Sequence, residues 1–193
     1  MRTHALALLL VLGVATPATV ASAQEGGGGR VTIDRPHQGS RPFQLDIHGG
    51  FTWWGVGAAT GVRFGIPLVD NGFVSEINNA VYLNFGFDFY WVRWRCRRGG
   101  CSNGWDYNAG FGFPVTLHWE FYFNENWSAF AEIGGQFFIH PAWWDGGNFD
   151  WREPGAWFIW TVGGSFHVNE WFLLTLRVGS PYIAFGITFQ FGG

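Results

Sequence analysis

The sequence predicts an all-β protein, an antiparallel up-and-down β-barrel of eight strands. Three observations lead to this fold. Apolar residues alternate with small or polar residues from Phe43 to Phe191, which is the pattern of strands with two different faces. The chain has 30 glycines, is 20% aromatic and is only 13% charged. Short Asn/Glu turns separate several segments, so sequential neighbours should pair antiparallel.

The chain divides into three parts. In residues 1–23, Arg2 and His4 precede an apolar run that ends in Ala21-Ser22-Ala23, the pattern of a cleavable secretory signal. Residues 24–42 are rich in Gly, Arg and Pro and show no period, so we expect a flexible periplasmic segment. Residues 43–193 form the predicted barrel domain. No later run approaches the roughly 20 apolar residues of a membrane helix, so only strands could cross a membrane.

Eight segments carry the alternation, and their ranges are 43–53, 56–66, 81–91, 111–121, 127–140, 157–168, 172–178 and 183–191. Tight turns follow Phe123 and Val168, whereas 95–108 and 141–156 are long loops expected at the opposite end. Short turns at one end and long loops at the other are typical of outer-membrane barrels. Within the connection 67–79, residues 72–79 suggest a short helix. A count of ten strands stays open, because 67–79 and 141–156 could hide short strands.

The apolar face is expected to contact lipid, because it carries almost no charge. Tyr and Trp gather near strand ends, as in two interfacial girdles: Trp53, Trp54, Tyr90, Trp91, Trp94, Trp119, Tyr122, Trp127, Trp157 and Trp171. The net charge of −3 argues against nucleic acid as a partner. We therefore expect a bacterial outer-membrane protein, surrounded by outer-membrane lipids and monomeric. The alternative is a soluble secreted β-barrel that binds an apolar ligand.

The C-terminal segment Ala184-Phe185-Gly186-Ile187-Thr188-Phe189-Gln190-Phe191 resembles the assembly signal of bacterial outer-membrane proteins. The resemblance rests on Gly186, Phe189 and Phe191. Ala184 stands where that class prefers a polar residue, and two glycines follow the final aromatic residue. The resemblance implies recognition by the outer-membrane assembly machinery. The whole domain resembles the broad class of small OmpA-like and OmpW-like barrels, which share an architecture and not one activity.

Charged residues of both signs stand on the polar face and predict a hydrogen-bonded network inside the barrel, because a buried unpaired charge is strongly unfavourable. The expected members are Asp46, His48, Arg63, Asp88, Tyr90, His118, Glu120, Glu132 and Arg177. Glycines on the same face suit the narrow interior of an eight-stranded barrel. The network would fill and brace the barrel, and a narrow solute path is the alternative.

The loop after the third segment combines cysteine and arginine. Cys96 and Cys101 flank four residues, and export permits a disulfide between them. Arg93, Arg95, Arg97 and Arg98 stand beside tryptophans in an expected outer loop. Guanidinium groups suit phosphates, so this cluster is a candidate contact for lipopolysaccharide. A solvated hairpin is an equally acceptable interpretation.

The sequence contains few patterns typical of catalysis or cofactor binding. We expect that the protein is not an enzyme and binds no cofactor or metal. Ser165 and His167 share a face, but they lie near the expected periplasmic end, whereas a lipid-modifying barrel enzyme would need its nucleophile near the outer rim. Acidic residues around 145–153 with His140 make a weak calcium or metal candidate. The expected role is structural, surface interaction or small-solute permeability. An outer-membrane lipid-modifying enzyme is the runner-up.

Overall fold

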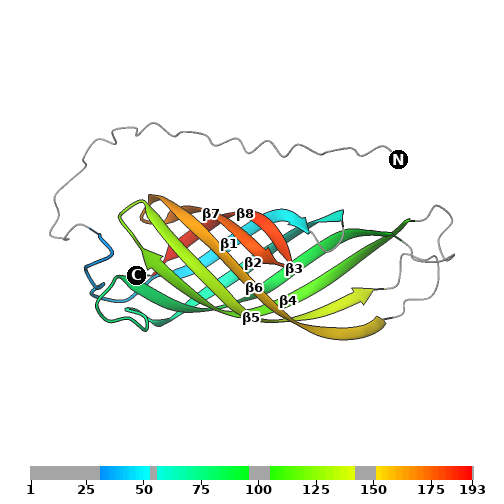
Figure 1. The fold of residues 1–193 in the computed structure, drawn as a ribbon, viewed down its shortest axis with the longest axis horizontal. Helices are drawn as coiled ribbons and strands as arrows, with labels where there is room; N and C mark the ends of the chain where they lie inside the picture. Colours follow the sequence, from blue (N-terminus) through cyan, green and yellow to red (C-terminus); the bar gives the residue numbers. More distant parts are fainter. Residues whose placement is uncertain (1–30, 53–55, 96–104, 142–150, 193) are drawn as a thin grey trace, which may run out of the picture.

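The chain folds into one closed antiparallel β-barrel of eight strands, each paired with its sequence neighbours (Figure 1). The computed structural model describes residues 31–52, 56–95, 105–141 and 151–192. The strands are β1 (Phe43–Thr52), β2 (Val56–Val69), β3 (Asn79–Arg95), β4 (Trp105–Tyr122), β5 (Trp127–Pro141), β6 (Trp151–Asn169), β7 (Phe172–Ser180) and β8 (Tyr182–Phe191). The predicted all-β, up-and-down eight-stranded barrel is therefore confirmed.

Closure comes from pairing of the first strand with the last. β1 pairs with β8 over its whole length, from Phe43 opposite Phe191 to Thr52 opposite Tyr182. Because strands alternate in direction, the turns β2–β3, β4–β5 and β6–β7 lie at the same end as both barrel termini. We call this end the turn end. Among the described residues, no helix is long and apolar enough to cross a membrane.

Side chains alternate between the interior and the outer surface, as a period of two requires. In β1, Asp46 and His48 are buried, whereas Ile47 is 48% exposed. In β7, Thr175 and Arg177 are buried, whereas Leu176 is 53% exposed. Most large apolar residues therefore stand outside the barrel and the polar residues inside, and the buried Phe130, Phe138, Ile159 and Leu173 are exceptions.

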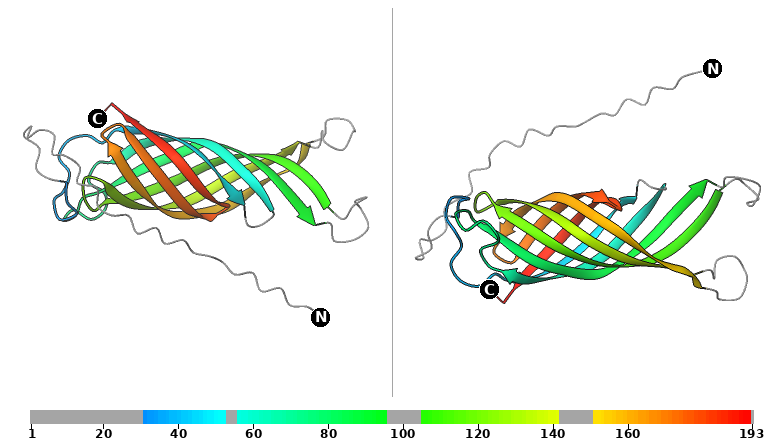
Figure 2. Two further views of the ribbon diagram at one scale, coloured as in Figure 1. Left: turned by 90° about the horizontal axis from the view of Figure 1, so that it is seen from above. Right: turned by 60° about the horizontal axis from the view of Figure 1, so that its bottom comes forward.

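The strands are unequal in length, and this differs from the prediction. β3, β4, β5 and β6 have 15 to 19 residues, whereas β7 has 9 and β8 has 10. The β3–β4 and β5–β6 hairpins extend past the β7–β8 end (Figure 2). The expected loops 95–108 and 141–156 were too long, because β4 begins at Trp105 and β6 at Trp151. Backbone pairing in the β3–β4 and β5–β6 hairpins continues to Arg95–Trp105 and Pro141–Trp151, although the apolar alternation has stopped before these residues.

The connection between β2 and β3 contains no helix, so the prediction of a short helix over 72–79 was wrong. β2 runs through a bulge to Val69, and residues 70–78 form turns. The Asn79 amide donates to the carbonyl oxygens of Val74 and Ile77, at 2.7 and 2.8 Å. These side-chain bonds compete with helical hydrogen bonds of the backbone.

Residues 31–42 cross the turn end and contact the barrel. The buried Arg41 guanidinium donates to the Asp70 carbonyl oxygen at 3.0 Å and to the Asn78 side chain, and it lies 4.1 Å from the ring centroid of Tyr122. Burial, together with the Arg41 charge, lowers the pKa of the His37 imidazole. Residues 31–42 of the expected flexible segment therefore make specific bonds, and 24–30 lie outside the described residues.

Candidate functional site

The interior of the barrel holds a chain of buried charged side chains, which we call the charge chain. Its first part joins three strands at the β1–β8 side. Arg177 of β7 contacts Asp46 of β1, with 2.9 Å between Nη1 and Oδ1. The Nδ1 atom of His48 lies 2.8 Å from the same carboxylate, and its Nε2 atom lies 3.1 Å from Asp88 of β3.

The second part of the charge chain crosses the lumen. Arg63 of β2 contacts Asp88 at 3.3 Å and also reaches Glu132 of β5 at 3.0 Å. His118 of β4 continues from Glu132, with 2.9 Å between Nδ1 and Oε1. Its Nε2 atom lies 3.7 Å from Glu120, which ends the charge chain. Every one of these side chains is at most 7% exposed.

Basic and acidic groups alternate along the whole chain. The order is Arg177, Asp46, His48, Asp88, Arg63, Glu132, His118 and Glu120. Each histidine stands between two carboxylates, so an imidazolium would donate to both of its neighbours. Four carboxylates face two guanidinium groups, and the charge chain is neutral when both histidines carry a proton. Such alternation compensates charges that burial would otherwise destabilise.

Hydroxyl and amide groups supply further hydrogen bonds to this chain. The Arg63 guanidinium donates to the Tyr182 hydroxyl at 2.6 Å. The Tyr90 hydroxyl donates to Asp88 at 3.0 Å and accepts from the Gln136 amide at 2.7 Å. Thr161 donates to Glu132 at 2.7 Å. All nine residues expected in the lumenal network are therefore buried and connected.

Sequence reasoning missed several of the uncharged members, notably Gln136, Thr161 and Tyr182. Their positions within the strands could have identified them. Each falls on the inward-facing register of its strand, where Gln136 shares a face with Glu132 and Tyr182 with Ala184. The prediction was based mainly on charged residues and therefore left out an amide, a hydroxyl and a phenol at inward-facing positions.

Two tyrosines expected in the interfacial girdles point inward instead. Tyr90 is 1% exposed and Tyr122 is 5% exposed. The Tyr122 hydroxyl donates to Glu120 at 3.0 Å and lies 3.2 Å from the Tyr82 hydroxyl. The reason is register, because Tyr122 has the same parity as Glu120 on β4. Its place near a strand end therefore did not determine its face.

Glycines give the charge chain the room that it needs. A Cβ atom built on Gly61 would lie 2.3 Å from Asp88 Oδ1 and 2.8 Å from His48 Nε2. On Gly186 it would lie 2.4 Å from Thr175 Oγ1 and 2.6 Å from Asp46 Oδ2. Side chains larger than hydrogen at these positions would displace the network.

A serine, a histidine and a carboxylate meet near the turn end, but they do not form a catalytic triad. The Ser128 hydroxyl donates to Glu120 at 2.6 Å and lies 3.0 Å from His167 Nε2. In a triad the acid would instead orient the histidine through Nδ1. Ser128 is only 2% exposed, as is Ser165, so neither presents a nucleophile to a substrate.

Several other sequence candidates lie outside what the structure describes. These are Cys96, Cys101, Arg97, Arg98 and the acidic loop at 145–150. Arg93 and Arg95 belong to β3 and pair with Tyr107 and Trp105, but their side chains are not described, nor are those of His140 and Glu153. The expected disulfide and lipopolysaccharide contact remain predictions.

The three residues of the C-terminal assembly signal lie in β8. Gly186 faces the interior beside Asp46. Phe191 is 52% exposed and stacks on Phe43, with ring centroids 6.0 Å apart. Phe189 stacks on Trp171 at 6.2 Å. The aromatic residues of the signal therefore belong to the seam that closes the barrel, and their recognition by assembly machinery remains a prediction.

Comparisons with known proteins assign no family to this chain: no family model matches it, and no curated protein matches it significantly. In the described part of the chain, no group of three His, Cys, Asp or Glu side chains is arranged to hold a metal ion.

We predict that Arg177→Met destabilises the folded barrel by about 3–5 kcal/mol, because Asp46 is left buried without its cation. Adding Asp46→Asn removes both members of the terminal pair and restores the alternation, so the double variant should recover part of this loss. The measurement is the free energy of unfolding in detergent micelles. Equal unfolding midpoints for wild type and Arg177→Met would contradict the role of the charge chain.

Proposed function

We propose that the protein is an integral outer-membrane β-barrel of a two-membrane bacterium, with a lumen closed by its own side chains. Its role is structural or one of surface interaction, and an open pore is not part of the proposal. One observation carries this proposal: the barrel buries its charged groups and exposes its apolar ones. A soluble barrel has the reverse arrangement, because its apolar face must leave water.

The outer surface supports lipid contact. Large apolar side chains at least one-third exposed occur on all eight strands, including Ile47, Phe64, Phe85, Phe87, Phe113, Val115, Leu117, Ile133, Phe137, Trp160, Val162, Leu176, Phe185 and Ile187. Soluble monomers rarely expose contiguous apolar patches larger than a few hundred Å². In a lipid bilayer these side chains contact hydrocarbon, so their exposure to water no longer costs free energy. The closed barrel also pairs its strands without a free edge, as a membrane requires.

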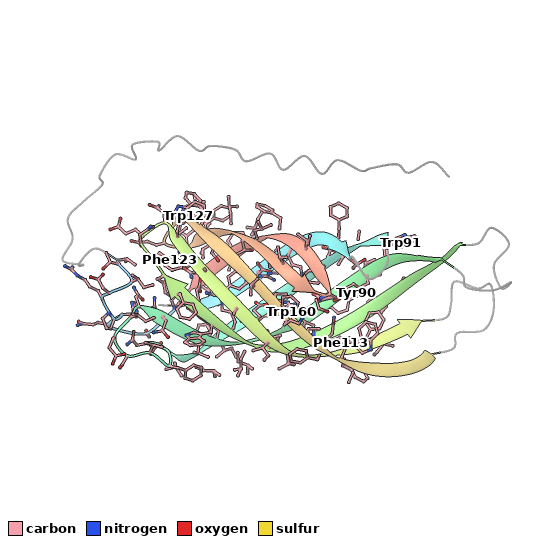
Figure 3. The ribbon with its side chains drawn as sticks, viewed as in Figure 1. Tyr90, Trp91, Phe113, Phe123, Trp127 and Trp160 are labelled. Carbon is pink, nitrogen blue, oxygen red and sulfur yellow. The ribbon has the colours of Figure 1, made fainter. Side chains whose placement is uncertain are left out.

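Aromatic residues near the strand ends support an interfacial position. Phe123 and Trp127 lie at the turn end, whereas Trp91 lies nearer the opposite end (Figure 3). Their exposed fractions are 46%, 53% and 40%. Aromatic rings at both borders of an apolar belt are typical of transmembrane barrels. The secretory signal expected at 1–23 supplies the route of export.

The test of location is fractionation of cells that express the full chain, followed by electrophoresis of heated and unheated samples. We expect the protein in the outer-membrane fraction, with different mobility in the two samples, because a folded barrel resists detergent until it is heated. Recovery from the periplasm without detergent would contradict the proposal and favour a soluble secreted barrel.

A paired substitution tests which face meets lipid. Ile133 is an outward-facing residue within β5 and is 55% exposed, so Ile133→Arg should lower the free energy of unfolding in lipid by about 2–4 kcal/mol. Phe123→Arg at the turn end is the matched control, with an expected loss of about 0–1 kcal/mol. A soluble barrel would tolerate Ile133→Arg at least as well as Phe123→Arg, because both side chains would already face water.

The closed lumen predicts that the purified protein passes no ionic current in a planar lipid bilayer. Arg63 from β2 meets Glu132 from β5 across the interior, and both are buried among polar neighbours. The double variant Arg63→Ala/Glu132→Ala removes both side chains from the crossing and should admit current if it folds. Discrete conductance steps in the wild-type protein would contradict the closed lumen and favour the solute path.

A further inference from the structure

A small cavity inside the barrel is lined by both arginines of the charge chain, Arg63 and Arg177. Its volume is about 10 Å³, and its walls include Arg63, Arg177, Asn84, His118 and Gly65. All four of the polar residues are at most 5% exposed. Phe130 and Leu173 also contribute to its wall, so buried polar and apolar side chains together surround the cavity.

Some polar atoms on these side chains have no hydrogen-bond partner among the described residues. They are Arg63 Nε, Arg177 Nε, Asn84 Oδ1 and His118 Nε2. Other atoms of the same side chains are bonded: Asn84 donates through Nδ2 to Glu132 at 3.0 Å, and Arg177 contacts Asp46 through Nη1. A buried polar group without a hydrogen-bond partner is strongly unfavourable, so several on the residues around one cavity indicate a ligand.

The donor and acceptor character of these atoms indicates which kind of ligand fits the cavity. The two Nε–H groups are donors, and Asn84 Oδ1 is an acceptor. A single water molecule can accept two hydrogen bonds and donate to the amide oxygen, and a cavity of roughly 10–15 Å³ holds one water. The carboxylates of Asp46 and Glu120 line the cavity together with the two guanidinium groups, so these four charges balance and favour a neutral ligand over an ion. A halide could not donate to Asn84 and needs more space.

We propose that one water molecule is bound in this cavity as a permanent part of the fold. It accepts hydrogen bonds from Arg63 and Arg177 and donates one to Asn84. Since Arg177 and Arg63 are already joined through Asp46, His48 and Asp88, the water closes this part of the charge chain into a ring. The two guanidinium groups are thereby held apart by a bridging oxygen instead of facing each other directly.

The test is a crystal structure of the wild-type barrel at a resolution that shows ordered solvent, with a second crystal soaked in bromide. We expect a solvent peak within hydrogen-bond distance of Arg63 Nε, Arg177 Nε and Asn84 Oδ1, and no anomalous signal from bromide. An empty cavity would overturn the proposal. A bromide peak would also overturn it, because the site would then bind an anion.

A variant supplies an independent measurement in solution. A Cβ atom on Gly65 would lie 2.8 Å from Asn84 Oδ1, so Gly65→Ala should expel the water. Oxygen-17 magnetic relaxation of the folded barrel counts long-lived internal waters, and the count should fall by one. The control is Gly164→Ala, whose Cβ would meet only Ser128 O at 3.5 Å and should leave the count unchanged. An equal count in Gly65→Ala and wild type would contradict the site.

Discussion

Charge compensation inside a narrow barrel is the constraint on which the rest of this structure depends. Burial of an ionised carboxylate costs several kcal/mol unless a cation and hydrogen bonds compensate it. Among the side chains that the structure describes, four carboxylates are buried, and every one of them contacts a basic side chain from the charge chain. Arg63 is central, because it links Asp88 to Glu132 and thereby joins the β1–β3 side of the lumen to the β4–β5 side.

This constraint also explains the small residues of the interior. Eight strands enclose a lumen only just wide enough for side chains, so large charged groups need neighbours without side chains. Gly61 lies against His48 and Asp88, and Gly186 lies against Asp46. Glycine at positions 61 and 186 is therefore a packing requirement of the buried network, and neither position needs an unusual backbone conformation.

The sequence predicted the faces better than the contacts. A period of two determines which side of a strand each residue occupies, so Asp46, Arg63 and Glu132 could be placed inside without a structure. It does not determine register between strands, and therefore could not reveal that Arg63 meets Glu132. Tyr122 was misplaced because nearness to a strand end outweighed parity. The turn at 70–78 was misread because its structure depends on Asn79 and on the distant residue Arg41.

The arrangement of polarity also limits where a function can reside. Every member of the charge chain already contacts another member. Near the turn end, Ser128 donates to Glu120 and lies within hydrogen-bond distance of His167. A solute would have to break several of these bonds to pass, with no compensation from a wide aqueous path. The outer ends of the long hairpins lie outside the lumen, so binding there would not require breaking the bonds of the charge chain. Strands β3, β4, β5 and β6 extend past the shorter β7 and β8, so backbone pairing at this end continues further than barrel closure requires.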